Sequence, residues 1–116
     1  MRFTLVLDFT EMTYYGGIIP NTPFPPDPRI EEHHFDEEDR DLLNEFFVDD
    51  INQYCGTLLD DGDLDFYDKD KCILLKKWLA EKIPTLSNER LKNLYSKLLE
   101  YATKAIKLNT GVVIEL

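Results

Sequence analysis

The stretch LLDDGDLDFYDKDK, residues 58–71, holds six aspartates around one glycine. Closely spaced carboxylates beside a glycine turn are the donor set that Ca²⁺ takes in EF-hand loops, with acids or amides at positions 1, 3 and 5 and glycine at position 6. If Gly62 occupies position 6, Leu59 falls on position 3. If Asp61 occupies position 1, Phe66 falls on the glycine position. Because neither register fits, we interpret the stretch as a solvated turn followed by a helix cap.

Both histidines of the chain lie in IEEHHFDEEDRD, residues 30–41. The spacing from Glu31 to His34, and from His34 to Glu37, lets a carboxylate and an imidazole share one helical face, as in di-iron bundles. Such a site needs a second matching motif, and the sequence has no further histidine. A metal-binding protein or enzyme that uses His33 and His34 with nearby carboxylates is therefore an alternative. We favour an acidic helix N-terminus preceded by exposed histidines, with no metal and no cofactor.

The segment LVLDFT, residues 5–10, is an apolar strand that ends in an aspartate. It resembles the first motif of the haloacid-dehalogenase-like phosphatases, in which the strand-end aspartate attacks phosphorus. That family has a second aspartate where this chain has Thr10, and it needs a parallel sheet of several strands. A chain with two or three strands cannot build that sheet, so we interpret Asp8 as a strand-end residue.

Other catalytic motifs are absent from the sequence, which contains no GxSxG and no glycine-rich phosphate loop. Cys55 and Cys72 lie 17 positions apart, without a CxxC pair and without a neighbouring histidine. This spacing predicts two reduced, partly buried thiols and does not indicate a reactive cysteine. The sequence therefore favours a protein that is not an enzyme.

The charges of the chain are strongly segregated. Residues 27–70 hold 17 acidic and 3 basic side chains, a net charge of −14, whereas residues 71–108 hold 9 basic and 3 acidic side chains, a net charge of +6. The total is −10. Nucleic-acid binding depends on phosphate neutralisation by Lys and Arg, so we expect no direct nucleic-acid partner. The same electrostatics favour a basic protein as partner.

Two strands and three helices must position these residues. FTLVLDF (3–9) and GVVIEL (111–116) predict two strands that pair in one sheet, and LDFY (64–67) could add a short third strand. Five of the six prolines fall in residues 16–28, which predicts an ordered loop across the core. A proline-recognition ligand at PPDPR (25–29) is a weaker alternative.

The three predicted helices lie between residues 36 and 109, where apolar side chains recur at spacings of three and four. Their expected limits are a cap at Asp36 and a stop at Gly56, a cap at Asp68 or Asp70 and a stop before Pro84, and a start at Ser87 with a turn at 109–111. The sequence therefore predicts an α+β fold, with three α-helices packed against a small sheet of the N- and C-terminal strands.

The length of 116 residues and the 43% apolar content suit one compact domain spanning residues 1–116. We expect no membrane partner, because no run approaches the 18 apolar residues that mark a membrane helix. Asp8 and Glu11 interrupt the apolar N-terminal stretch too early for a signal peptide. These features predict a cytoplasmic protein.

The function that we favour at this stage is a small acidic binding or inhibitor protein that masks a basic surface on a partner protein. In physical type it is similar to immunity proteins that neutralise toxic nucleases and to acidic phage inhibitors that imitate nucleic acid. A self-associating domain is a further alternative. The alternation at 63–66 suggests that Leu64 and Phe66 face the core. The candidate partner-binding residues are Asp60, Asp61, Asp63, Asp65, Tyr67, Glu37, Glu38 and Asp41.

Overall fold

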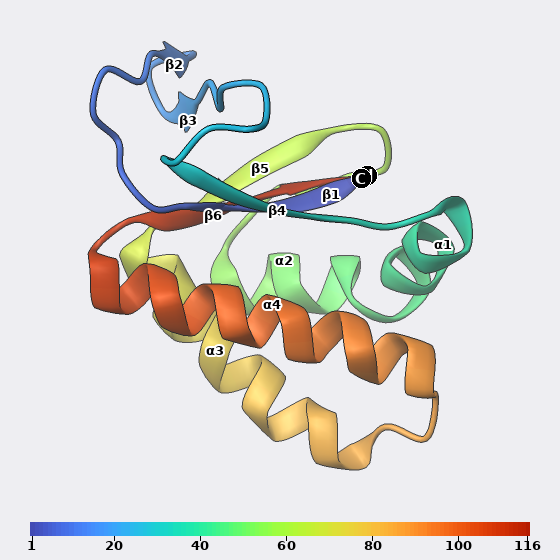
Figure 1. Ribbon diagram of the computed structural model, residues 1–116. Helices are drawn as coiled ribbons and strands as arrows, with labels where there is room; N and C mark the ends of the chain where they lie inside the picture. Colours follow the sequence, from blue (N-terminus) through green and yellow to red (C-terminus); the bar gives the residue numbers. More distant parts are fainter.

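The protein is an α+β fold in which four helices cover one face of a four-stranded antiparallel sheet (Figure 1). The computed structural model describes residues 1–116. The strand order is β4-β1-β6-β5. The strands are β1 (Arg2–Val6), β4 (Ile30–His34), β5 (Leu64–Tyr67) and β6 (Gly111–Glu115). A separate hairpin of β2 (Tyr14–Tyr15) and β3 (Ile19–Pro20) lies over the opposite face.

The predicted pairing of the terminal strands is confirmed, since β1 and β6 are antiparallel neighbours at the centre of the sheet. Phe3 lies opposite Ile114, and Leu5 lies opposite Val112. All four side chains are fully buried in the main core. Successive residues of a strand point to opposite faces of the sheet, so these four side chains share one face. The helices pack against that face. The expected third strand is also confirmed as β5, which pairs with β6.

Three of the four α-helices begin at side-chain caps close to the predicted positions. Asp36 caps α1 (Glu37–Phe46) in a reciprocal pair with Asp39, and Asp68 caps α3 (Lys69–Lys82). Asn88 caps α4 (Glu89–Leu108). The short α2 (Val48–Cys55) ends at Gly56, whose φ of 67° is the left-handed conformation that glycine adopts readily. A short 3₁₀ helix, η1 (Ile83–Thr85), follows α3.

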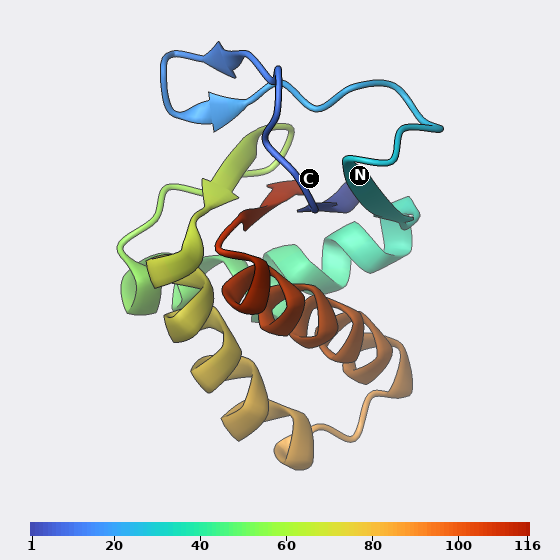
Figure 2. The same ribbon diagram turned by 60° about the vertical axis from the view of Figure 1, so that its left-hand side comes forward.

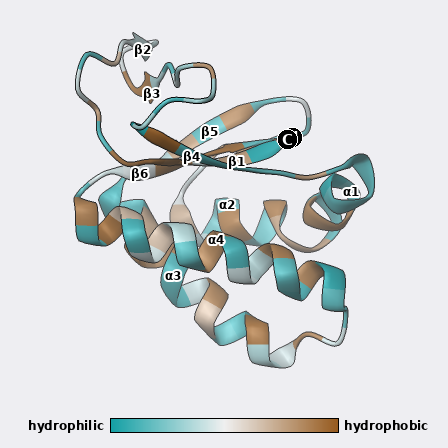
Figure 3. Ribbon diagram, viewed as in Figure 1, coloured by the Kyte–Doolittle hydropathy of each residue, from teal (hydrophilic) through white to brown (hydrophobic).

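The long helix α4 crosses under the sheet and contacts β1 and β6, while α3 packs beside it (Figure 2). Hydrophobic and hydrophilic residues alternate along both helices, as expected of helices with one buried face (Figure 3). On α4 the buried residues recur at helical spacing: Leu91, Leu94, Tyr95, Leu98, Tyr101, Ala102 and Ala105. The helices thus supply most of the core residues on their side of the sheet.

Two sequence predictions differ from the structure. The single helix expected from Asp36 to Gly56 is divided at Phe47 into α1 and α2, so the fold has four α-helices. Residues 30–34, expected to precede a helix as an exposed segment, form the edge strand β4. This strand carries mainly charged and polar side chains, and its partner β1 supplies the hydrogen bonds that make it a strand.

The face of the sheet that points away from the helices is called the upper face, and the face under which the helices lie is called the lower face (Figure 1). The chain between β1 and β4 covers part of the upper face. Met12 and Phe9 of this segment pack on Val6 and Ile30. The hairpin of β2 and β3 continues the cover toward β5, with which β3 makes contact. The helices therefore cover the lower face of the sheet, and the segment between β1 and β4, with its hairpin of β2 and β3, covers part of the upper face.

Candidate functional site

The segment 57–63 between α2 and β5, together with the first two residues of β5 (64 and 65), is called the acidic loop below. Asn52 on α2 holds it with three hydrogen bonds. The amide Nδ2 donates to the carbonyl of Leu59 at 2.8 Å, and Oδ1 accepts from the Leu59 N–H at 2.8 Å and from the Thr57 hydroxyl at 2.9 Å. The side chain of Leu59, which belongs to the loop, is buried in the main core. One side chain therefore fixes the backbone of the loop onto the helix.

The far end of the acidic loop is tied to the C-terminal residue. The Gly62 N–H donates to the Leu116 carbonyl at 3.2 Å, and the Leu116 N–H donates to the Asp63 carbonyl at 2.9 Å. Gly62 has a φ of 75°, which permits this tight turn. With its two ends held in this way, the loop presents its side chains from a fixed backbone.

Three aspartates of the acidic loop bond the backbone N–H of the next residue, each at 2.8 Å, namely Asp60, Asp63 and Asp65. Asp65 also accepts from the Leu58 N–H at 3.2 Å. Asp60 and Asp63 are exposed and form no ion pair. Their negative charges are therefore balanced by solvent ions alone, which leaves them available to a cationic partner.

Arg40 joins α1 to the acidic loop. Its guanidinium lies 3.2 Å from a carboxylate oxygen of Glu37 and 3.4 Å from one of Asp61. Asp41, the neighbouring residue on α1, lies 3.9 Å from the same group. The structure thus brings the carboxylates of α1 and of the loop into one surface, although they are separated by about twenty residues in the chain.

Glu38 belongs to a different cluster. Its carboxylate lies 3.2 Å from Arg90 of α4, which also pairs with Asp36 and Asp39. Arg90 holds the start of α1 against α4. The hydrogen bond from the backbone N–H of Asp39 lowers the pKa of Asp36, and the hydrogen bond and charge of Arg90 lower this pKa further. Of the predicted partner-binding residues on α1, Glu37 and Asp41 adjoin the acidic loop and Glu38 does not.

Tyr67, which the sequence predicted as a partner-binding residue, does not lie on the surface of the protein. Tyr67 is fully buried, and its hydroxyl lies 3.0 Å from the Thr57 hydroxyl. Burial raises the pKa of this phenol well above its usual value. The apolar side chain that the loop does expose is Leu58, at 88%. Sequence reasoning missed it because Leu58 is followed by Leu59, and nothing in the sequence indicates which of the two leucines is exposed.

The two histidines lie on opposite faces of β4, because adjacent residues of a strand alternate. His33 faces the helices, stacks on Phe3 with ring centroids 6.1 Å apart, and has its pKa lowered by burial and by nearby Lys97. His34 lies 3.3 Å from Glu32 on the upper face. The helical spacing that suggested a shared metal site does not apply to a strand. No group of three or more metal-ligating side chains is arranged to hold a metal ion.

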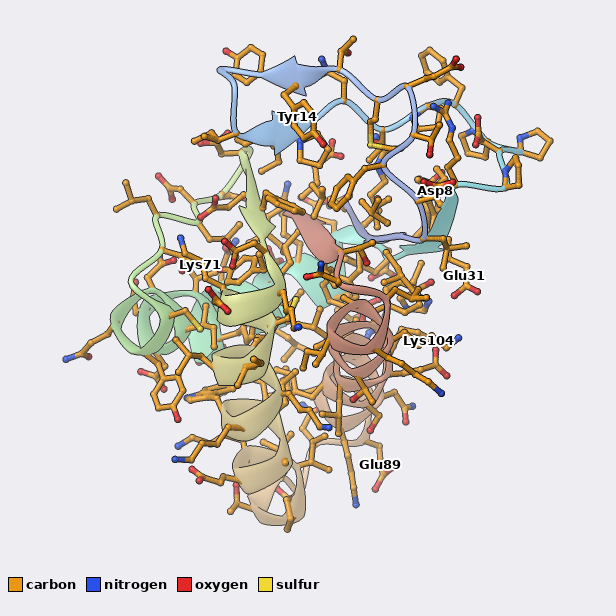
Figure 4. The ribbon with its side chains drawn as sticks, turned by 90° about the vertical axis from the view of Figure 1, so that its left-hand side faces the viewer. Asp8, Tyr14, Glu31, Lys71, Glu89 and Lys104 are labelled. Carbon is orange, nitrogen blue, oxygen red and sulfur yellow. The ribbon has the colours of Figure 1, made fainter.

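Asp8 is an exposed residue just beyond β1. Its carboxylate accepts from the Thr10 N–H at 2.9 Å and from the Thr10 hydroxyl at 2.6 Å, and these bonds lower its pKa. Figure 4 shows Asp8 beside the segment that covers the upper face. The sheet is antiparallel throughout, unlike the parallel sheet of the phosphatase family that the LVLDFT motif resembles.

Cys55 and Cys72 are free and buried, and burial raises the pKa of the Cys72 thiol to about 12 and that of Cys55 to about 11. A raised pKa leaves almost no thiolate at pH 8, and thiolate is the reactive form. We therefore expect the folded protein to react slowly with Ellman's reagent at pH 8. In denaturing urea both thiols should react at once, and rapid reaction of either thiol in the folded protein would contradict the buried placement.

Comparison with protein-family models, with curated proteins and with solved structures finds no match for this chain. None of the helices combines the length and the apolar character that crossing a membrane requires. The candidate functional surface of the protein consists of the acidic loop together with Glu37 and Asp41.

Proposed function

We propose that the protein binds a basic surface of another protein through the acidic loop, and thereby blocks that surface. The observation that carries the proposal is Leu58, which is 88% exposed on a firmly held loop that also carries Asp60 and Asp63, two exposed aspartates without a cationic partner. Protein interfaces commonly place an apolar anchor at the centre of a polar rim. Leu58 supplies such an anchor, and Asp60, Asp61 and Asp63 supply the rim.

The charges of the surface select the class of partner. Exposed, unpaired carboxylates attract a basic surface and accelerate its association, and they repel phosphate-bearing ligands. Proteins that bind phosphate groups present such basic surfaces, so a nuclease or another nucleic-acid-binding protein is the partner class that we infer. The proposed role is inhibition by occupation of that site, without catalysis. Two free thiols are in keeping with a reducing, cytoplasmic setting.

The rigidity of the acidic loop also supports the proposal. Association costs free energy when loops and side chains become ordered at the interface. Here Asn52 and the Leu116 backbone already order the loop. The loop can therefore bind without a large entropic cost of ordering.

The test is a binding experiment with immobilised protein and lysate of the source cells at low and moderate salt. The loop variant carries Asp60→Lys, Asp61→Lys and Asp63→Lys, and leaves Asp65 intact because Asp65 bonds the Leu58 N–H. The control variant carries the same charge change on the helices, as Glu81→Lys, Glu89→Lys and Glu100→Lys. A second loop variant, Leu58→Ala, removes the apolar anchor without a change of charge.

We expect the wild type and the control to retain the same basic proteins, and both loop variants to lose them. Truncation of a central anchor typically costs about 2 kcal/mol or more of binding free energy, a loss of about 30-fold in affinity. Equal retention by the wild type and the loop charge variant would refute the proposal.

A further inference from the structure

A hollow of about 350 Å³ lies where the segment that follows β1 meets the start of α3 and the end of α4. Three aromatic side chains line it, namely Phe9 of that segment, Tyr14 of β2 and Phe66 of β5. We call it the aromatic hollow. Figure 4 shows Tyr14 on the hairpin above β5. None of the residues that line the hollow belongs to the acidic loop, so it is a separate feature of the surface.

The three rings stand at an angle to one another. The centroids of Phe9 and Phe66 lie 6.2 Å apart with their ring planes at 80°, and those of Phe9 and Tyr14 lie 6.3 Å apart with their planes at 39°. Phe9 also packs on the small apolar cluster that lies under the covering segment, which holds its ring in place. Rings arranged in this way form a corner, and a small group in that corner contacts more than one ring.

The position of the Phe66 ring depends on Gly111, the first residue of β6. A Cβ atom on Gly111 would lie 2.5 Å from Cε1 of Phe66 and 2.5 Å from the carbonyl oxygen of Tyr67. Both distances are well below van der Waals contact, so the ring lies against the backbone there only because glycine has no side chain. Gly111 therefore lets Phe66 reach the place from which it lines the hollow.

The charged residues that line the hollow favour a cation. Asp68 and Asp70, at the start of α3, are exposed, and neither carboxylate takes part in an ion pair. Asp68 uses one oxygen to cap α3 and keeps the other free. Lys69 is the one cation among the lining residues, so these three charges sum to −1. Ring faces carry partial negative charge and attract a cation as well.

Hydrogen-bond acceptors are scarce deeper in the hollow. Thr110 is the only buried residue that lines it, and its hydroxyl has no hydrogen-bond partner. A primary ammonium group has three N–H donors and loses their bonds to water when it enters such a site. A quaternary ammonium group has no N–H to satisfy, and its methyl groups pack directly on the rings. The hollow therefore favours the methylated form of a cation.

We propose that the aromatic hollow binds a quaternary ammonium group, such as that of choline or of a trimethylated lysine side chain. Phe9, Tyr14 and Phe66 provide the ring faces, and the two aspartates provide the attracting charge. Recognition of such cations by several aromatic rings is a recurrent use of the cation–π interaction. This site is additional to the proposed function, because it shares no residue with the acidic loop.

The experiment is a titration of the whole protein with two pairs of probes, followed by the backbone amide signals in NMR. The first pair is choline and dimethylbutanol, the neutral alcohol in which a carbon atom replaces the charged nitrogen. The second pair is the N-acetyl amide of trimethyllysine and that of unmodified lysine, which have equal charge. We expect saturable shifts at residues 9, 14, 66 and 68–70 with choline and with the trimethyllysine probe, and a dissociation constant on the order of millimolar.

Each pair removes one part of the proposed recognition. An equal response to dimethylbutanol would show an apolar site without cation recognition, and an equal response to unmodified lysine would show attraction by charge alone. Either result, or shifts confined to other surfaces, overturns the proposal. Tighter binding of the trimethyllysine probe than of choline assigns the site to a modified protein side chain, and the reverse order assigns it to a small molecule.

The hairpin offers a matched pair of variants, because Tyr14 lines the aromatic hollow and the neighbouring Tyr15 does not. Tyr14→Leu should weaken choline about two- to fivefold, the effect of one partly exposed ring, and Tyr14→Phe should bind as the wild type does. Tyr15→Leu should have no effect. Lys69→Gln should strengthen binding about twofold, because it removes a like charge. Equal affinity in Tyr14→Leu and Tyr15→Leu, with intact spectra, refutes the assignment.

The probe experiment needs no partner protein, so its failure is distinct from failure of the proposed function. If choline does not bind but the loop variants lose a basic protein, the aromatic hollow is wrong and the acidic loop stands. If choline binds but the loop charge variant retains every protein, the hollow stands as a quaternary ammonium site without the masking role.

Discussion

The Phe47→Ala variant is expected to lose about 3–5 kcal/mol of unfolding free energy, the range found when a buried phenylalanine is truncated. Phe47 is fully buried at the junction of α1 and α2. Its ring centroid lies 5.6 Å from that of Trp78 on α3 and 5.7 Å from that of Tyr95 on α4. Removal of the ring leaves a cavity where all four helices are joined.

The chain provides its own control in Phe46, the preceding residue, which is 48% exposed. Phe46→Ala should change the unfolding free energy by less than about 1 kcal/mol, because surface truncations leave no cavity. Urea unfolding followed by the fluorescence of Trp78, the single tryptophan, measures both variants. If Phe47→Ala does not fold, Phe47→Leu should retain the fold and lose less. Equal midpoints for the two alanine variants would contradict the packing described.

The contrast between these neighbours was partly visible in the sequence. Leu43, Phe47 and Ile51 recur at a spacing of four, and all three are fully buried as the periodicity predicts. Tyr54 and Phe46, which the same apolar pattern also includes, are 38% and 48% exposed. The division at Phe47 was not visible, because its φ of −115° is a modest departure that leaves the periodicity intact. A helix can therefore be interrupted without loss of its apolar stripe. The stripe can be predicted from the sequence, whereas the interruption cannot.

The edge strand β4 was not predicted, because its sequence lacks the apolar pattern that the helices have. IEEHH has a single strongly apolar residue, Ile30, and offers no alternating pattern that would indicate a half-buried strand. Its conformation is imposed by β1, which is far away in the chain. The ion pairs of Arg2 with Glu32 and Glu115 depend on that pairing and on the register of β6, so no local motif could have indicated them.

The acidic loop was predicted only in part. The turn at Gly62 and the cap at Asp68 are where the sequence placed them. The assignment of faces was wrong for β5, because its lower face carries Tyr67 into the core while its upper face is covered by the hairpin segment. An alternating pattern predicts a strand with one buried face and one solvent-exposed face. This prediction fails for β5, because other segments cover both of its faces.

Asn52→Ala is expected to lower the unfolding free energy by about 2–6 kcal/mol. The N–H and the carbonyl of buried Leu59 both lose their partner, and each unpaired buried group costs about 1–3 kcal/mol. The exposed neighbour Gln53 makes no such bonds, and Gln53→Ala serves as the control. Amide hydrogen exchange measures the effect where it arises. The Leu59 amide should exchange about 30-fold faster or more in Asn52→Ala, and equal exchange in the two variants would refute the anchoring role.

The same variant separates rigidity from charge in the proposed function. Asn52→Ala leaves every carboxylate of the acidic loop in place, so attraction by charge alone predicts undiminished retention of a basic partner. If the fixed loop matters, the variant must first order residues 57–63 on binding, and part of the binding free energy is lost to that ordering. We expect weaker retention by Asn52→Ala than by Gln53→Ala, with the difference persisting at high salt. Equal retention by Asn52→Ala and Gln53→Ala would instead assign the binding to charge alone, because both variants keep every carboxylate of the loop and salt screens only the charge interactions.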